Sequence, residues 1–135
     1  MGKSPQAIQM GQKSFLIVED DIESCKILNI ILADYELTVA HTLASAQSHF
    51  QARHFDIFML DNWLPDGSGI DFCREIRSVH PDAPILFTSA AAHTDNIDEA
   101  VDAGATHYVV KPFDPFELQE IVKDLLRSPA GDGSS

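Results

Sequence analysis

Carboxylate, hydroxyl and amino side chains follow the ends of separate apolar runs in this sequence. Glu19 and Asp20 come directly after the first run, and Asp61 follows the third. Ser89 follows the fourth run and Lys111 the fifth. In an open parallel sheet the functional crevice lies at the carboxyl ends of the strands. We therefore expect these five side chains to converge on one edge of a sheet.

Such a set of side chains is typical of metal-assisted phosphoryl transfer. Carboxylates held close together repel one another, and hard oxygen ligands of this kind suit Mg²⁺. A lysine and a hydroxyl provide two further donors for phosphoryl oxygens. An aspartate can itself be the nucleophile and form an aspartyl-phosphate. The pattern therefore predicts a carboxylate that accepts a phosphoryl group beside a divalent cation.

Five short apolar runs must supply the strands that position these residues, at 15–18, 37–40, 57–60, 85–88 and 108–110. The runs do not alternate apolar with polar residues, which is typical of strands buried on both faces of a parallel sheet. The segments between them repeat apolar residues at helical spacing. Strand and helix alternate five times, so we predict a single α/β sandwich with helices on both faces.

Local signals mark where the helices begin and end. Asp20 or Asp21 can cap the first helix, Gly104 can end the fourth, and Pro115 suits the first turn of the fifth. The fourth helix carries an apolar stripe that predicts its buried face, made of Ile97, Ala100, Val101 and Gly104.

Composition excludes several classes of protein. The chain has 135 residues and 14.9 kDa, the size of one domain. Its 21 acidic and 9 basic side chains give a net charge of −12, which argues against direct binding to nucleic acid. No apolar run approaches the ~20 residues of a membrane helix, and no signal peptide is recognisable. Cys25 and Cys73 lack CxxC spacing and the six histidines lack HExxH spacing, so we expect neither a zinc site nor a disulfide framework. We therefore expect the protein in a reducing compartment, the cytoplasm.

The two ends of the chain differ in composition from its centre. Residues 1–13 show no apolar period and are expected to form a flexible leader. Residues 128–135 are small, polar and turn-forming, which is typical of a linker or tail. We favour a linker to a further domain over a free-standing protein. The predicted domain is 14–127.

Five motifs stand in order along the chain, namely IVEDD (17–21), MLD (59–61), LPDGSG (64–69), TSA (88–90) and GATHYVVKPF (104–113). In their order and spacing, these motifs together resemble those of a response-regulator receiver domain of two-component signalling. The resemblance covers roughly residues 14–127. It implies a flavodoxin-like (βα)5 fold with a five-stranded parallel sheet in the order 2-1-3-4-5.

The resemblance also implies roles at the metal and acceptor positions. Asp61 would be the phosphorylated aspartate. Asp20 would bind Mg²⁺, or Mn²⁺ in its place, directly, and Glu19 through water. Trp63 would contribute its backbone carbonyl to the metal.

Further roles follow for the strand ends on the other side of the acceptor. Ser89 and Lys111 would each bind a phosphoryl oxygen. Tyr108 would be an aromatic switch that turns inward when Ser89 moves toward the phosphate. The Lys111–Pro112 peptide bond would be cis.

The resemblance implies a signalling acceptor and not an enzyme with its own substrate. The donor would be a phosphohistidine on a sensor histidine kinase or a histidine phosphotransfer protein. The downstream partner, an output domain or a second copy of the chain, would bind the face of the fourth helix, fifth strand and fifth helix. No direct nucleic-acid or membrane partner is expected.

Some positions depart from the commonest pattern of the family. Glu19 stands for an aspartate and Ser89 for a threonine, both conservative changes. Trp63 is unusually large for the position two after the acceptor. Ala91 occupies the other position that flanks the path of attacking water. We therefore predict a changed lifetime of the phosphorylated state.

Other interpretations exist for the individual residues and for the chain. Taken alone, the Asp20–Asp21 pair could serve only to cap a helix. Asp61 could be a turn residue at a strand end, Ser89 a loop hydroxyl, and Tyr108 a residue that only packs in the core. An aspartyl phosphatase of the haloacid-dehalogenase type needs Asp-x-Asp, whereas this chain has Asp61-Asn62-Trp63. A degenerate receiver that serves only for docking would lack the chemical residues. The coincidence of all five strand-end features favours the acceptor.

Overall fold

The computed structural model describes residues 12–90 and 97–127, so most of the leader, the tail and Ala91 lie outside the described residues. The main strands are β1 (Ser14–Val18), β2 (Glu36–Ala40), β3 (Ile57–Asp61), β6 (Ile85–Ala90) and β7 (His107–Lys111). The helices are α2 (Ile22–Ile31), α3 (Leu43–Ala52), α4 (Gly69–Val79), α5 (Ile97–Ala103) and α6 (Pro115–Arg127). A small hairpin joins β4 (Trp63–Leu64) to β5 (Gly67–Ser68).

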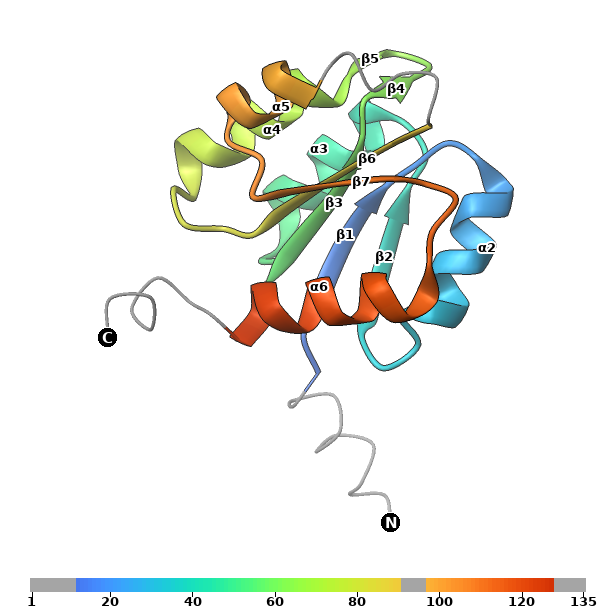
Figure 1. Ribbon diagram of the computed structural model, residues 1–135. Coiled ribbons are helices and arrows are strands. Elements are labelled where there is room, and N and C mark those ends of the chain that lie inside the picture. The colour runs from blue at the N-terminus through green and yellow to red at the C-terminus, as the bar shows by residue number, and fades with distance from the viewer. Residues whose placement is uncertain (1–11, 91–96, 128–135) are drawn as a thin grey trace.

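All neighbouring strands of the main sheet are parallel, and their order is β2-β1-β3-β6-β7. Counting only these five strands, this is the order 2-1-3-4-5, so the predicted flavodoxin-like fold is confirmed. Figure 1 shows α6 crossing one face of the sheet beside α2, with α3, α4 and α5 on the other face. The order places β1 and β3 side by side at the centre, with β7 at one edge.

The strands are apolar on both faces because each face is covered by helices. On one face Phe15, Ile17 and Met59 pack against buried residues of α2 and α6. On the other face Leu16 and Phe58 pack against buried residues of α3, α4 and α5. Alternate residues of one strand thus enter different cores, which explains the continuous apolar runs.

The predicted helix limits agree with the structure at three positions. Asp21 is the N-cap of α2 and accepts from the Ser24 N–H at 3.2 Å, which leaves Asp20 outside the cap. Pro115 begins α6, and Gly104 follows α5 with φ +113°. In the left-handed region a glycine avoids the strain that a Cβ would cause.

The predicted buried face of α5 is wrong at Val101, whose side chain is 56% exposed. Ala100 and Ala103 are the buried residues of this helix. The Cys73 thiol of α4 donates to the Ala103 carbonyl at 3.5 Å. The small side chains of Ala100 and Ala103 allow α5 to pack closely against α4. In this orientation of α5, Val101 faces solvent. Within the described ranges, no helix has the length and apolar character needed to cross a bilayer.

Candidate functional site

Three carboxylates meet at the carboxyl ends of β1 and β3. Each of Glu19, Asp20 and Asp61 offers one oxygen, and these oxygens all lie within 4.8 Å of one another. Glu19 and Asp61 are buried, whereas Asp20 is exposed to solvent. The two strands are parallel neighbours, so the residues that end them are brought together by the register of the sheet. We call this group of three carboxylates the acidic pocket; it is buried at Glu19 and Asp61 and exposed to solvent at Asp20.

An ammonium group enters this cluster from the last strand. Lys111 Nζ lies 2.8 Å from Glu19 Oε1 and 3.4 Å from Asp61 Oδ2. Burial alone lowers the pKa of Lys111, but the contact with Glu19 and the charges of both carboxylates outweigh it, so the pKa is raised overall. Lys111 therefore stays charged and partly neutralises the carboxylates around it.

Glu19 is held from several sides. Its Oε2 accepts from the Asp21 N–H at 3.0 Å, and its backbone carbonyl contacts His41 Nδ1 at 2.9 Å. Burial raises the pKa of Glu19 to about 7; the contact with Lys111 opposes this shift and the charge of Asp61 adds to it. The buried Oε1 accepts no hydrogen bond of ordinary geometry from the described residues, although the ion pair is close.

This donor set fits a hard divalent cation. When ionised, the three carboxylates carry two more negative charges than the single ammonium balances. The ligands offered are carboxylate oxygens, which Mg²⁺ and Mn²⁺ prefer. Glu19 Oε1 still has unused acceptor capacity. A cation bound here would lower the cost of keeping Glu19 ionised in a buried place.

The orientation of the Asp61 carboxylate is set by its own loop. Asp61 Oδ1 accepts from the Trp63 N–H at 3.1 Å, so Oδ2 is the oxygen that faces Lys111. Close behind it, a Cβ at Gly69 would lie 2.2 Å from the Asp61 carbonyl oxygen. No larger residue fits at Gly69 without moving the backbone of Asp61.

The remaining predicted residues lie on β6 and β7. Ser89 is fully buried, and its hydroxyl donates to the Ala90 carbonyl at 3.2 Å. The ring of Tyr108 stacks on Phe87 with centroids 6.1 Å apart. The Tyr108 hydroxyl is buried and has no hydrogen-bond partner within the described ranges. The Lys111–Pro112 peptide bond is cis.

Trp63 lies beside the acceptor with 52% of its surface exposed. It lines a cavity of about 400 Å³ together with Asn62, Leu64, Gly67 and Ser68. The structure therefore brings Glu19, Asp20, Asp61 and Lys111 into one cluster, and the Trp63 backbone contacts Asp61 in that cluster.

Two contacts of the site were not expected from the sequence. His41 supports the Glu19 carbonyl, and Asp66 binds the start of α3. The contact of His41 with Glu19 has a signal in the sequence, because His41 directly follows the second apolar run. That run forms β2, which pairs with β1, and Glu19 directly follows β1. The second depends on the path of the hairpin, and no sequence signal marks it.

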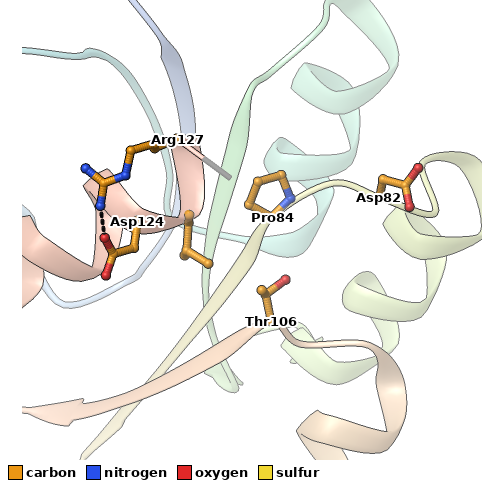
Figure 2. Close-up of a pocket in the computed structure, with 6 residues that line it drawn as sticks. Asp82, Pro84, Thr106, Asp124 and Arg127 are labelled. Atoms are coloured by element: carbon orange, nitrogen blue, oxygen red, sulfur yellow. Dashed lines mark hydrogen bonds and ion pairs between the residues drawn. The ribbon is translucent and has the colours of Figure 1, made fainter. Parts of the chain in front are cut away.

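A second hollow, of about 490 Å³, lies at the amino-terminal ends of β6 and β7, away from the carboxyl ends that carry the predicted site (Figure 2). Pro84 and Thr106, which precede β6 and β7, line it together with the end of α6. Its charged groups include Asp82 and the ion pair between Asp124 and Arg127. The predicted site residues lie at the other ends of the strands, so this hollow is not part of the acidic pocket.

Comparison with known proteins agrees with this geometry. Residues 15–123 match the family model described as the response regulator receiver domain. The transcriptional regulatory protein ZraR of Salmonella typhimurium is 31% identical over 118 residues, which cover 86% of this chain and 27% of that protein. The DNA-binding transcriptional activator DevR/DosR of Mycobacterium tuberculosis is 34% identical over 116 residues, which cover 84% of this chain and 54% of that protein. The chain thus spans between about a quarter and about half of these two curated relatives.

Solved structures show the same fold. A two-component response regulator from Clostridium difficile superposes with a TM-score of 0.80 at 27% identity, covering 86% of this chain and 97% of the other. A CheY-like receiver domain protein from Methanospirillum hungatei gives 0.81 at 26% identity, covering 87% and 96%. With a family model that matches most of the chain and a sheet edge that carries the acidic cluster and its lysine, the chain belongs to the response regulator receiver domain family.

Proposed function

We propose that this receiver domain accepts a phosphoryl group on Asp61. The observation that carries the proposal is the contact of the buried Asp61 carboxylate with Lys111 at 3.4 Å, inside a cluster of acidic oxygens. Glu19, Asp20 and Asp61, with the Trp63 backbone carbonyl, would hold Mg²⁺ or Mn²⁺. The cation would neutralise the carboxylates and the incoming phosphoryl oxygens.

The reaction is a transfer between two nucleophiles. An oxygen of Asp61 attacks the phosphorus of a phosphohistidine, and the bond between phosphorus and the imidazole nitrogen breaks. The imidazole keeps the electron pair of that bond. Lys111 and the Ser89 hydroxyl donate to phosphoryl oxygens and favour the charge distribution of the transition state. The chain is then a signalling acceptor, with slow self-catalysed loss of the phosphoryl group.

The phosphorylated state would be transmitted through Ser89 and Tyr108. The new group carries ~1.5–2 negative charges by analogy with other phosphorylated side chains. It would draw the Ser89 hydroxyl toward it and let Tyr108 change its position. This shifts the equilibrium of the face formed by α5, β7 and α6. A shift from 1:99 to 99:1 needs ~5.5 kcal/mol of differential stabilisation.

The partners follow from this chemistry. The donor is a sensor histidine kinase or a histidine phosphotransfer protein, and we place the exchange in the cytoplasm. The face of α5, β7 and α6 would bind an output domain or a second copy of the chain. The curated relatives described above are transcriptional regulators that extend well beyond the matched part. We assign any contact with DNA to such a further domain, because this one is strongly acidic.

One experiment separates the functions that this site permits. The protein is incubated with phosphoramidate or acetyl phosphate and Mg²⁺, and its intact mass is measured. A gain of about 80 Da per molecule that is absent in Asp61→Asn supports the acceptor. Rapid release of phosphate over many turnovers would instead indicate a phosphatase. No gain at all would indicate a receiver that serves only for docking.

A further inference from the structure

The Asp66 carboxylate binds the start of a helix that lies more than twenty residues earlier in the chain. Its Oδ1 accepts from the Leu43 N–H at 2.8 Å, and its Oδ2 accepts from the Ala44 N–H at 3.0 Å. The N-cap residue of α3, Thr42, accepts from the Ser45 N–H at 3.1 Å. Asp66 therefore satisfies two of the N–H groups that a helix start leaves without partners. These hydrogen bonds lower the pKa of Asp66.

Asp66 lies at the tip of the β4–β5 hairpin. The hairpin pairs Trp63 with Ser68 and Leu64 with Gly67. Gly67 has φ +149°, and a Cβ there would lie 2.7 Å from the Cδ1 of a leucine at the start of α3. The tip thus runs against α3, and the Asp66 hydrogen bonds fasten it there.

The base of the same hairpin carries the acceptor. The Trp63 N–H donates to Asp61 Oδ1 at 3.1 Å. The Ser68 hydroxyl donates to Asn62 Oδ1 at 2.7 Å, and the Gly69 N–H donates to the Asn62 carbonyl at 3.2 Å. A displacement of either hairpin strand therefore moves the backbone that orients the Asp61 carboxylate.

A cavity borders the hairpin on one side. Among the described residues, this cavity of about 400 Å³ is lined by hairpin residues and Asn62, and Asp66 itself is exposed. A hairpin with two residues in each strand has little stability of its own. The attachment of its tip to α3 is thus a principal restraint on its position.

We propose that Asp66 is a positioning residue for the acceptor site. By fastening the hairpin tip to α3, Asp66 fixes the Trp63 backbone and, through it, the Asp61 carboxylate and the carbonyl assigned to the cation. This inference rests on the proposed function of Asp61. A purely structural role would predict that Asp66 matters only for the stability of α3.

The test compares two variants that each remove a cap from the same helix. Asp66→Ala releases the hairpin tip, whereas the matched control Thr42→Ala removes the Ser45 hydrogen bond and leaves the hairpin attached. Mg²⁺ affinity is measured by the fluorescence of Trp63, the only tryptophan of the chain. The rate of labelling by phosphoramidate is measured by intact mass, and the melting temperature is recorded for both variants.

We expect both variants to melt at a lower temperature than the parent. We expect Asp66→Ala to bind Mg²⁺ about tenfold more weakly than the parent and to be labelled about tenfold more slowly. We expect Thr42→Ala to change the Mg²⁺ affinity and the labelling rate by less than about twofold. A difference between the two variants below about threefold in both readouts would overturn the proposal. If Asp66→Ala does not fold, Asp66→Asn replaces it, because an amide oxygen keeps one acceptor. A parent protein that gains no mass would refute the acceptor function itself, whereas a labelled parent with an equally labelled Asp66→Ala would refute only this inference.

Discussion

Lys111 lies closer to Glu19 than to the proposed acceptor, at 2.8 Å against 3.4 Å. The Glu19 side chain is only 2% exposed, so this is a buried ion pair and not a surface contact. In the unphosphorylated protein the ammonium thus serves mainly to neutralise Glu19. The ammonium has three N–H donors, so in the proposed phosphorylated state it could contact a phosphoryl oxygen as well as Glu19, and a cation beside Glu19 would lower the cost of weakening the contact with Glu19.

Lys111→Met is expected to lower the free energy of unfolding by about 3 kcal/mol in metal-free buffer, because Glu19 and Asp61 then lack their cationic partner. Lys123→Met is the control, since Lys123 forms an exposed pair with Glu120. That change is expected to cost less than about 0.5 kcal/mol. Urea denaturation measures both values. Equal losses in the two variants would show that the buried pair has no special weight.

Trp63→Asn is expected to shorten the lifetime of phosphorylated Asp61 severalfold. Trp63 is half-exposed and its backbone N–H contacts the Asp61 carboxylate, so we expect its large indole to restrict the approach of water and asparagine to leave that approach open. Trp63→Phe keeps most of the apolar bulk and serves as the control. The decay of the 80 Da adduct is followed by intact mass after the donor is removed. The same decay rate in all three proteins would contradict the prediction.

Tyr108→Phe is expected to stabilise the unphosphorylated protein by about 1 kcal/mol, because the buried hydroxyl has no partner among the described residues and phenylalanine keeps the stacking on Phe87. Thermal or urea denaturation measures the difference. A variant less stable than the parent would mean that the Tyr108 hydroxyl makes a favourable interaction, which would contradict the prediction.

Asp56 predicts a dependence of stability on pH away from the acidic pocket. Burial raises its pKa, but the hydrogen bonds from the Ser14 N–H at 2.8 Å and hydroxyl at 3.2 Å outweigh this, so the pKa is lowered overall. A lowered pKa adds stability above the unfolded value of about 3.9, and the gain is lost as the pH falls through the folded pKa.

Asp56→Asn should therefore lower the free energy of unfolding by about 1 kcal/mol at pH 7. The difference from the parent should stay constant down to about pH 5 and narrow below about pH 4. Asp34→Asn, at an exposed position, is the control and should change little at either pH. Urea denaturation across this range measures the effect. A difference that grows as the pH falls would contradict it.

The sheet was predictable because its strands are buried on both faces. Continuous apolar runs such as 15–18 and 57–60 mark such strands, and each of the five strands of the main sheet contains its predicted run. The convergence of Glu19, Asp61 and Lys111 followed from the same register, because residues that end parallel strands meet at one edge. Local rules were therefore enough for the fold and for most of the acidic pocket.

Contacts that depend on loop paths were not predictable. The LPDGSG segment (64–69) stood out in the sequence only as one motif of the family, and the structure shows a hairpin there whose Asp66 reaches a helix 22 residues earlier. The exposed position of Val101 likewise depends on how closely two alanines let α5 approach α4. Such details are set by tertiary packing and have no local signal in the sequence.

Lys111 is carried by β7, which within the described ranges is the last strand and pairs only with β6. A growing polypeptide therefore completes the acceptor site only after almost the whole domain has been synthesised. Fraying of this one edge would withdraw the ammonium while the other four strands stay paired. Competence for labelling would then report on the pairing of this edge strand with β6.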